Sequence, residues 1–272
     1  STGEPGGHHF LQPALVAPLV RKVGGTIVEC NTAYGGGRAK TEDHLKAAAD
    51  HGFTAIAPVD IMDAEGEVRL PVEGGRHLKY DIVGSHFPEY DFVVVLSHFK
   101  GHECTGFGGA IKNIGMGCGS RAGKMEQHCE GKPSVNQSAC VGCGACNRIC
   151  AHDAPVIKNH KATIDHEKCV GCGRCLAVCP KDAIAADFVD SLAMLNYKIA
   201  EYSLAVCKDR PCFHVSLICD VSPNCDCHAE NDIPIIPNIG MLASFDPVAL
   251  DQACADLCNQ AAPVAESILG EN

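Results

Sequence analysis

The feature that most constrains this chain is a cysteine spacing that occurs twice, Cys-x2-Cys-x2-Cys-x3-Cys. The first copy begins at Cys140 and the second at Cys169. The two copies place eight cysteines between residues 137 and 185, a segment too short to bury a large apolar core of its own. The whole chain contains 19 cysteines, and this odd total argues against a disulfide scaffold and favours bound metal.

Both copies match the cysteine run of bacterial ferredoxins that carry two 4Fe-4S clusters. In such a run the fourth cysteine ligates the cluster of the other copy. We therefore predict that one cluster is held by Cys140, Cys143, Cys146 and Cys179, and the other by Cys169, Cys172, Cys175 and Cys150. The glycines at positions 142, 144, 171 and 173 suit a close backbone approach to the cluster sulfurs. Zinc is the alternative, but two runs of four thiolates are typical of clusters.

Outside this segment the sequence alternates between helical and strand patterns. This predicts an α/β fold with a mostly parallel sheet and covering helices. We expect helices at residues 11–23, 41–52 and 187–205 and after Asp246, which precedes a proline, and Thr41 is a candidate N-cap. We expect strands at residues 26–30, 53–59, 68–72, 78–83, 91–97, 213–218 and 234–239.

This pattern predicts an α/β domain that is interrupted by a ferredoxin-like insert carrying the two 4Fe-4S clusters. Residues 1–133 and 186–272 are expected to form the α/β domain, and residues 134–185 the insert. The turn at residues 3–6 has no strand before it, so we expect that a first element is missing.

Composition excludes several classes of protein. The net charge of −11 would repel nucleic acid, and the absence of Trp argues against large stacking platforms for bases. No uninterrupted apolar stretch reaches the ~18 residues that a membrane span needs. We therefore expect a cytoplasmic protein with no membrane span and no nucleic-acid partner. Nothing in the sequence indicates its oligomeric state.

A glycine-rich segment follows the strand expected at residues 91–97. Sites in open α/β sheets usually lie at the carboxyl ends of strands. The glycines would let a phosphate or carboxylate approach backbone N–H groups at a helix start, and Lys112 adds positive charge. The alternative is a glycine turn required for tight packing of a helix on the sheet. The candidate ligand-binding residues are His98, Gly106, Gly108, Gly109, Lys112 and Asn113.

The cysteines outside the two runs divide into two kinds. Cys225 and Cys227 flank an aspartate in a polar loop that follows an expected strand, so they are candidates for a third metal site. Cys254 and Cys258 are spaced i, i+4 in the last helix among aliphatic residues, which predicts core packing.

Several motifs together resemble the iron–sulfur-centre proteins grouped as domain of unknown function 362. They are residues 3–6 (Gly-Glu-Pro-Gly), 97–102 (Ser-His-Phe-Lys-Gly-His), 106–117 (beginning Gly-Phe-Gly-Gly) and 225–227 (Cys-Asp-Cys). The resemblance covers nearly the whole chain. It implies a strand before residue 3, and it implies no particular reaction.

The order and spacing of His102, Lys112 and His128 are similar to those in the nickel-pincer lactate racemases. That similarity implies that Lys112 tethers an organic cofactor, that His128 ligates nickel and that His102 acts as acid and base. The second catalytic histidine of that family is absent, because residues 36–38 are Gly-Gly-Arg. The similarity therefore implies a shared scaffold more than a shared reaction.

Together these patterns predict an iron–sulfur oxidoreductase of anaerobic metabolism. Two 4Fe-4S clusters would exchange electrons with a third metal or an organic cofactor in the α/β domain, where His102, Lys112 and His128 are the candidate catalytic residues. The partner would be a redox protein or a small-molecule substrate. The alternative is a non-catalytic electron carrier or a protein that delivers metal or clusters.

Overall fold

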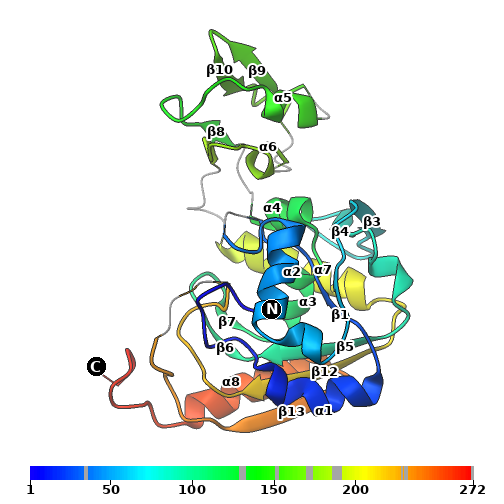
Figure 1. The fold of residues 1–272 in the computed structure, drawn as a ribbon, viewed down its shortest axis with the longest axis vertical. Coiled ribbons are helices and arrows are strands. Elements are labelled where there is room, and N and C mark those ends of the chain that lie inside the picture. The colour runs from blue at the N-terminus through cyan, green and yellow to red at the C-terminus, as the bar shows by residue number, and fades with distance from the viewer. Residues whose placement is uncertain are drawn as a thin grey trace.

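The computed structural model describes residues 1–33, 36–128, 133–150, 153–169, 174–185, 192–227, 229 and 232–270 of the 272-residue chain. The fold is mixed α/β, which confirms the expected class. A larger domain carries a small unit that stands apart from it, beyond helix α4 (Figure 1). No helix in these described ranges combines the length and the apolar character needed to cross a membrane.

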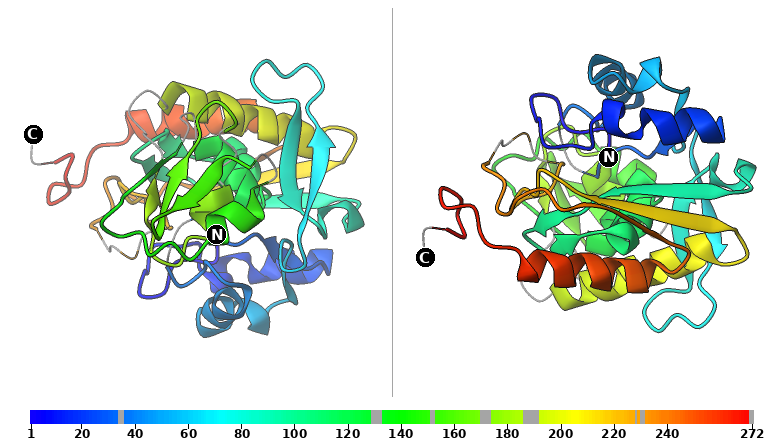
Figure 2. Two further views of the ribbon diagram at one scale, coloured as in Figure 1. Left: turned by 90° about the horizontal axis from the view of Figure 1, so that it is seen from above. Right: turned by 90° about the horizontal axis from the view of Figure 1, so that it is seen from below.

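A three-stranded sheet forms the centre of the larger domain. The strands are β5 (Val93–His98), β12 (Cys212–Ile218) and β13 (Gly240–Ser244). Strand β12 lies in the middle and pairs in parallel with β5 and antiparallel with β13. Helices cover both faces, α1 (Pro13–Val23) and α2 (Thr41–Asp50) on one side, α7 (Leu192–Cys207) and α8 (Pro247–Gln260) on the other (Figure 2).

Strand β12 shows why this sheet needs two covering layers. Successive side chains of a strand point to opposite faces, and here both sets are buried. Val215 and Leu217 pack in one apolar cluster with Val16 of α1. Ile218 packs on the opposite face with Cys254 of α8. Cys254 is therefore a core residue, as its helical spacing predicts.

The remaining strands of the larger domain do not join one mostly parallel sheet, and that part of the expectation is wrong. Strands β1 (Ile27–Glu29) and β2 (Val59–Ile61) form a parallel pair. Two antiparallel pairs follow, β3 (Glu67–Pro71) with β4 (Tyr80–Gly84) and β6 (Lys100–His102) with β7 (Gly106–Gly108). The segments that connect β3 with β4 and β6 with β7 are short, so these strands pair as antiparallel hairpins, whereas parallel strands need a long crossover connection.

Local differences from the sequence prediction have identifiable causes. Residues 53–59 form mainly a 3-10 turn (Phe53–Ala55), because Phe53 packs into the cluster of Ala48 beside α2. The strand expected at residues 234–239 begins only at Gly240, since that segment contains prolines that cannot donate to a strand ladder. Lys40 is the N-cap of α2, and Thr41 instead accepts a hydrogen bond from Asn31.

The small unit contains two antiparallel pairs and two short helices: β8 (Ser134–Val135), α5 (Ala145–Ile149), β9 (Pro155–Lys158), β10 (Lys161–Ile164), α6 (Arg174–Ala177) and β11 (Ile184–Ala185). Strands β9 and β10 form a hairpin. Strand β8 pairs with β11, so the chain enters and leaves the unit at neighbouring points (Figure 1). Such adjacent ends are what an insertion into another domain requires.

Two further helices connect the sheet with this unit, α3 (Ala110–Gly117) and α4 (Arg121–His128). A second 3-10 turn, Phe87–Glu89, precedes β5. Helix α3 lies against both β5 and α7, in the interior of the larger domain. Helix α4 contacts α6 of the small unit.

Candidate functional site

Two segments far apart in the sequence meet at one edge of the central sheet. Strands β5 and β12 are parallel neighbours, so the segments that follow them emerge at the same edge. The amide of Gly101 donates to the carbonyl oxygen of Ser222 (2.8 Å). A Cβ atom at Gly101 would lie 2.4 Å from the carbonyl oxygen of Pro223, so only glycine allows this approach. The sheet therefore brings the segment after β5 against the loop that carries Cys225 and Cys227.

The buried carboxylate of Asp226 joins the two segments. His98 Nδ1 and Lys100 Nζ each lie 3.0 Å from one of its oxygens. Burial alone would raise the pKa of Asp226, but the charge of Lys100 and the hydrogen bond from His98 hold that pKa below its usual value. The other ring nitrogen of His98 bonds the carbonyl oxygen of Cys219 (2.7 Å). Both His98 nitrogens are thus engaged within the protein, and its place here is to position Asp226.

The buried thiol of Cys225 lies beside the positive charge of Lys112. Lys112 Nζ donates to Cys225 Sγ over 3.3 Å, and the side chains of His102 and Cys227 also hydrogen-bond this sulfur. The hydrogen bond from Cys227 outweighs burial, and with the charges of Lys112 and Lys100 it holds the pKa of Cys225 well below its ordinary value. The same hydrogen bond is the main cause that raises the pKa of Cys227.

The hydrogen bonds around His102 define its tautomer. The backbone amides of Cys104 and Thr105 donate to His102 Nδ1 over 3.1 and 3.3 Å. Nδ1 is therefore an acceptor, which places the ring proton on Nε2 and leaves Nε2 as the donor toward Cys225.

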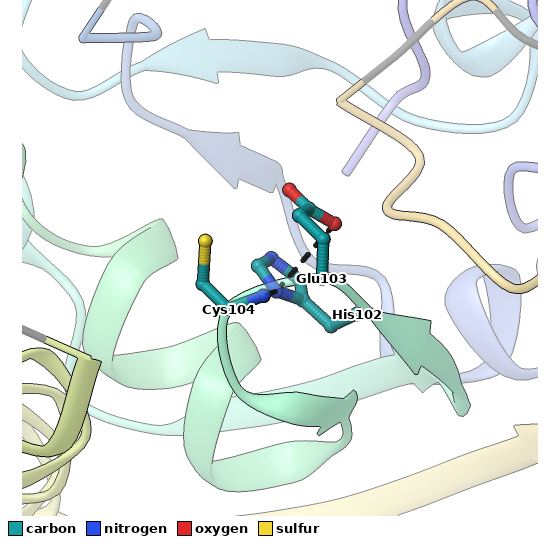
Figure 3. A group of neighbouring side chains, drawn as sticks. All are labelled: His102, Glu103 and Cys104. Carbon is teal, nitrogen blue, oxygen red and sulfur yellow. Dashed lines mark hydrogen bonds and ion pairs between the residues drawn. The ribbon is translucent and has the colours of Figure 1, made fainter. Parts of the chain in front are cut away.

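Figure 3 shows His102 between the thiol of Cys104 and the carboxylate of Glu103. The ligand atoms of these three residues lie within 4.8 Å of one another, which is close enough for one ion. The lone pair of His102 Nδ1, however, already accepts two backbone hydrogen bonds. A metal ligand needs a free lone pair, so His102 is poorly placed to bind an ion through Nδ1 together with Glu103 and Cys104.

His128 completes the group at the end of α4. Burial is the main reason that its pKa falls to about 4, and the positive charge of Lys112 lowers it further. His128 is therefore neutral at pH 7. The structure brings His102, Lys112 and His128, three candidates from the sequence, into one neighbourhood with Cys225.

The glycine-rich segment does not offer its helix-start amides to a ligand. The carboxylate of Asp251 in α8 accepts from the amides of Ala110 (2.6 Å) and Ile111 (3.0 Å) at the start of α3. A Cβ atom at Gly109 would lie 2.3 Å from an oxygen of Asp251. The expected approach of a ligand phosphate or carboxylate to these amides is therefore wrong, because a carboxylate of the protein already occupies that position.

The other candidates of this segment have different surroundings. Asn113 Nδ2 donates to the carbonyl oxygen of Leu96 (2.9 Å) and to Ser97 Oγ (3.1 Å), so it holds α3 against β5. Gly108 lies beside the Lys112 side chain, because a Cβ atom added at Gly108 would be 3.8 Å from Lys112 Cδ. Gly106 has φ of +77°, which the tight β6–β7 turn requires. These residues shape the site, and of the candidates in this segment only Lys112 directs its polar group at Cys225.

Replacing Gly109 by Ala should destabilise the protein strongly. The added methyl group would overlap the Asp251 carboxylate, and we expect a loss of about 2–4 kcal/mol in the free energy of unfolding. Gly108→Ala is the matched control, because its added Cβ would meet nothing closer than 3.8 Å. Thermal unfolding of the two variants should separate them clearly. Equal midpoints would show that α8 does not hold the start of α3 in this way.

In the small unit, one cavity is lined by three cysteines of the first run and by the last cysteine of the second: Cys140, Cys143, Cys146 and Cys179. The structure thus brings together the set that crossed ligation requires. The amide of Ala162 donates to Cys140 Sγ, and that of Ala183 to Cys179 Sγ, both over 3.3 Å. Donation from the backbone amides of Ala162 and Gly142 lowers the pKa of Cys140. Backbone N–H groups directed at cysteine sulfurs are typical of iron–sulfur sites.

Gly142 allows the β9–β10 turn to approach this cavity. It has φ of +65°, and a Cβ atom on it would lie 2.3 Å from the His160 carbonyl oxygen. Four cysteines with backbone N–H donors fit a zinc ion or a cluster, and the duplicated Cys-x2-Cys-x2-Cys-x3-Cys spacing favours the cluster.

The second cysteine set is described only in part. Cys175 is buried, and Cys150 and Cys169 are half-buried. Cys172, Gly171 and Gly173 lie outside the described residues. Cys258, the partner of Cys254 in α8, packs against the core without being fully buried.

Helix α4 links the cysteine cavity to the histidine and lysine site. Met125 belongs to the same apolar cluster as Cys140, Cys146 and Cys175. His128 follows three residues later, about 4.5 Å further along the helix axis. One rigid element therefore connects the two candidate centres.

Comparison with known families identifies the family of this chain. A family model, domain of unknown function 362, matches residues 1–256. The chain belongs to this family. The comparison with curated proteins found no match. The family name gives no reaction, so function has to be argued from the two centres themselves.

Sequence reasoning overlooked three residues of the sites. Asp251 and Lys100 form the contacts that arrange α3 and Asp226; Asp251 belongs to no recognisable motif, whereas Lys100 stands in the motif of residues 97–102. Asp226 itself stands between two candidate cysteines, and its place in that Cys-Asp-Cys sequence was the available signal.

Proposed function

We propose that this protein is an iron–sulfur oxidoreductase in which two 4Fe-4S clusters exchange electrons with a redox site in the α/β domain. The observation that carries the proposal is the cavity lined by Cys140, Cys143, Cys146 and Cys179. Three of these residues come from the first run and the fourth from the second, as crossed ligation of two clusters requires. The duplicated four-cysteine spacing is typical of cluster-binding runs rather than of zinc sites.

When bound, such clusters supply one-electron transfer. The residues of the chain have separate tasks. The amides of Ala162 and Ala183 stabilise negative charge on the cysteine sulfurs, and the apolar lining of the cavity limits access of water. Helix α4 provides a rigid connection between the small unit and the α/β site.

In the α/β site, each side chain is suited to holding charge or moving protons. Lys112 and the Nε2–H of His102 hold a negative sulfur at Cys225. Neutral His128 lies close to Lys112 and can hydrogen-bond a bound group without adding positive charge. Lys100 and His98 fix Asp226 and so hold the loop that carries both cysteines. A pure electron carrier would have no use for this arrangement.

The proposal is tested by anaerobic purification of the chain, followed by iron and sulfide quantitation and by electron paramagnetic resonance after reduction. We expect about eight iron atoms per chain and signals of reduced 4Fe-4S clusters. Stoichiometric zinc without sulfide would contradict the proposal.

The carrier alternative is tested on the same preparation by mass spectrometry of released and covalently attached small molecules. We expect a ligand whose content falls in Lys112→Ala but not in Lys46→Ala, which alters an exposed surface lysine. Iron content should remain unchanged in both variants. Full iron content with no ligand in any preparation would favour an electron carrier.

A further inference from the structure

We propose that Cys225 and Cys227 form a redox-active dithiol whose substrates are disulfides. This inference rests on the proposed function, because it specifies the substrate class of the same α/β site. It is carried by the contacts of the two sulfurs, by their unequal exposure and by the cations beside them.

The two sulfurs are close and differently placed. The side chains of Cys225 and Cys227 hydrogen-bond each other. Cysteines two positions apart have Cα atoms close enough for a disulfide to form with little backbone movement. Cys227 is exposed, whereas Cys225 is only 6% exposed. An incoming disulfide can therefore reach Cys227, while Cys225 is protected behind it.

The donors around Cys225 favour its thiolate. Lys112 Nζ and His102 each direct a hydrogen at Cys225 Sγ, and Lys100 adds a nearby charge. They stabilise negative charge on the sulfur, and the thiolate is the nucleophilic form in thiol–disulfide exchange.

The exchange proceeds in two balanced steps. The Cys227 sulfur attacks a substrate disulfide, RS–SR′, after its proton passes to the adjacent Cys225 sulfur, and R′S⁻ leaves. That thiolate takes up the proton from Cys225, which restores the Cys225 thiolate. The Cys225 thiolate then attacks the Cys227 sulfur, an internal disulfide forms and RS⁻ leaves. Two electrons pass to the substrate, and an external dithiol regenerates the pair by the reverse exchange.

The test uses the full-length, anaerobically purified protein with oxidised glutathione as the disulfide. After alkylation of free thiols, a protease that cleaves before aspartate separates residues 220–225 from residues 226–231. We expect these two peptides to become disulfide-linked as two glutathione thiols are released per link, and dithiothreitol to reverse the link. The same digest places Cys254 and Cys258 on separate peptides, which should remain unlinked as an internal control.

Single variants resolve the steps. Cys225→Ser should stop at a glutathione adduct on Cys227, and Cys227→Ser should give no linked peptides. Lys112→Met should slow formation of the link at least 10-fold, whereas Lys46→Met should not change it. Thermal unfolding of each variant shows whether it is folded.

The outcomes separate this inference from the proposed function. The disulfide link should form equally well in Cys143→Ala, which removes a cysteine of the cavity in the small unit. If the unmodified protein contains no iron but still forms the link, only the proposed function is contradicted. Thiols that resist oxidised glutathione in a folded, iron-containing protein would overturn the dithiol. A zinc or copper ion that is lost only on substitution of Cys225 or Cys227 would also overturn it.

Discussion

Substitution of Cys179 by Ala should remove about half of the iron from the anaerobically purified protein, from about eight atoms per chain to about four. The cavity explains the expected result, because Cys179 lines it together with Cys140, Cys143 and Cys146 rather than with its own run. The small unit should also lose stability, since an empty cavity leaves it without the bonds that tie its two halves together. Iron and sulfide quantitation and thermal unfolding measure both effects.

Double variants decide which cluster is lost. Cys143→Ala and Cys179→Ala should each leave the same residual spectrum, and the Cys143/Cys179 double variant should lose no more iron than either single one. A Cys150/Cys179 double variant should lose nearly all iron. If Cys143/Cys179 instead loses twice as much as Cys179→Ala alone, the two cysteines serve different clusters and crossed ligation is wrong. Cys258→Ala, in α8, is the control that should keep full iron content.

The parts of the structure that could be predicted are those in which spacing along the chain determines contact in space. The duplicated run indicated which cysteines would share a cavity, because the same spacing folds in the same way in each copy. The sequence also placed the glycine-rich segment and the loop of Cys225 directly after strands, and because parallel strands end at one edge of a sheet, the contact of Lys112 with Cys225 agrees with that pattern. Both predictions needed only local pattern and general topology.

The parts that could not be predicted depend on single contacts between distant segments. Asp251 lies in an ordinary helical pattern, and nothing in its neighbours indicates that it caps the start of α3. The glycines that suggested a ligand site are explained by that contact instead. Asp81 is a second case, since it lies in a strand and its burial follows only from the packing of α4 and α7 around it.

Replacing Asp81 by Asn should stabilise the protein at neutral pH. Asp81 is fully buried, and among the described residues neither carboxylate oxygen has a hydrogen-bond partner. Burial is the main cause that raises its pKa from 3.8 to about 8, and the negative charges of Glu126 and Glu201 raise it further. The folded state therefore holds a proton at pH 7 that the unfolded chain releases.

The sign of the pH dependence follows from this difference. Between pH 3.8 and about 8 the folded state binds more protons at Asp81 than the unfolded state does, so the contribution of this group to stability falls as pH rises. The asparagine side chain has nearly the same shape and no charge to release. We expect Asp81→Asn to gain about 2–3 kcal/mol at pH 7.5, or roughly 5–10 °C in the thermal midpoint, and almost nothing at pH 4. The control Asp91→Asn removes an exposed carboxylate and should change the midpoint little at either pH. An Asp81→Asn variant whose midpoint follows that of the unmodified protein at both pH values would show that the Asp81 carboxyl is ionised and solvated in the folded chain.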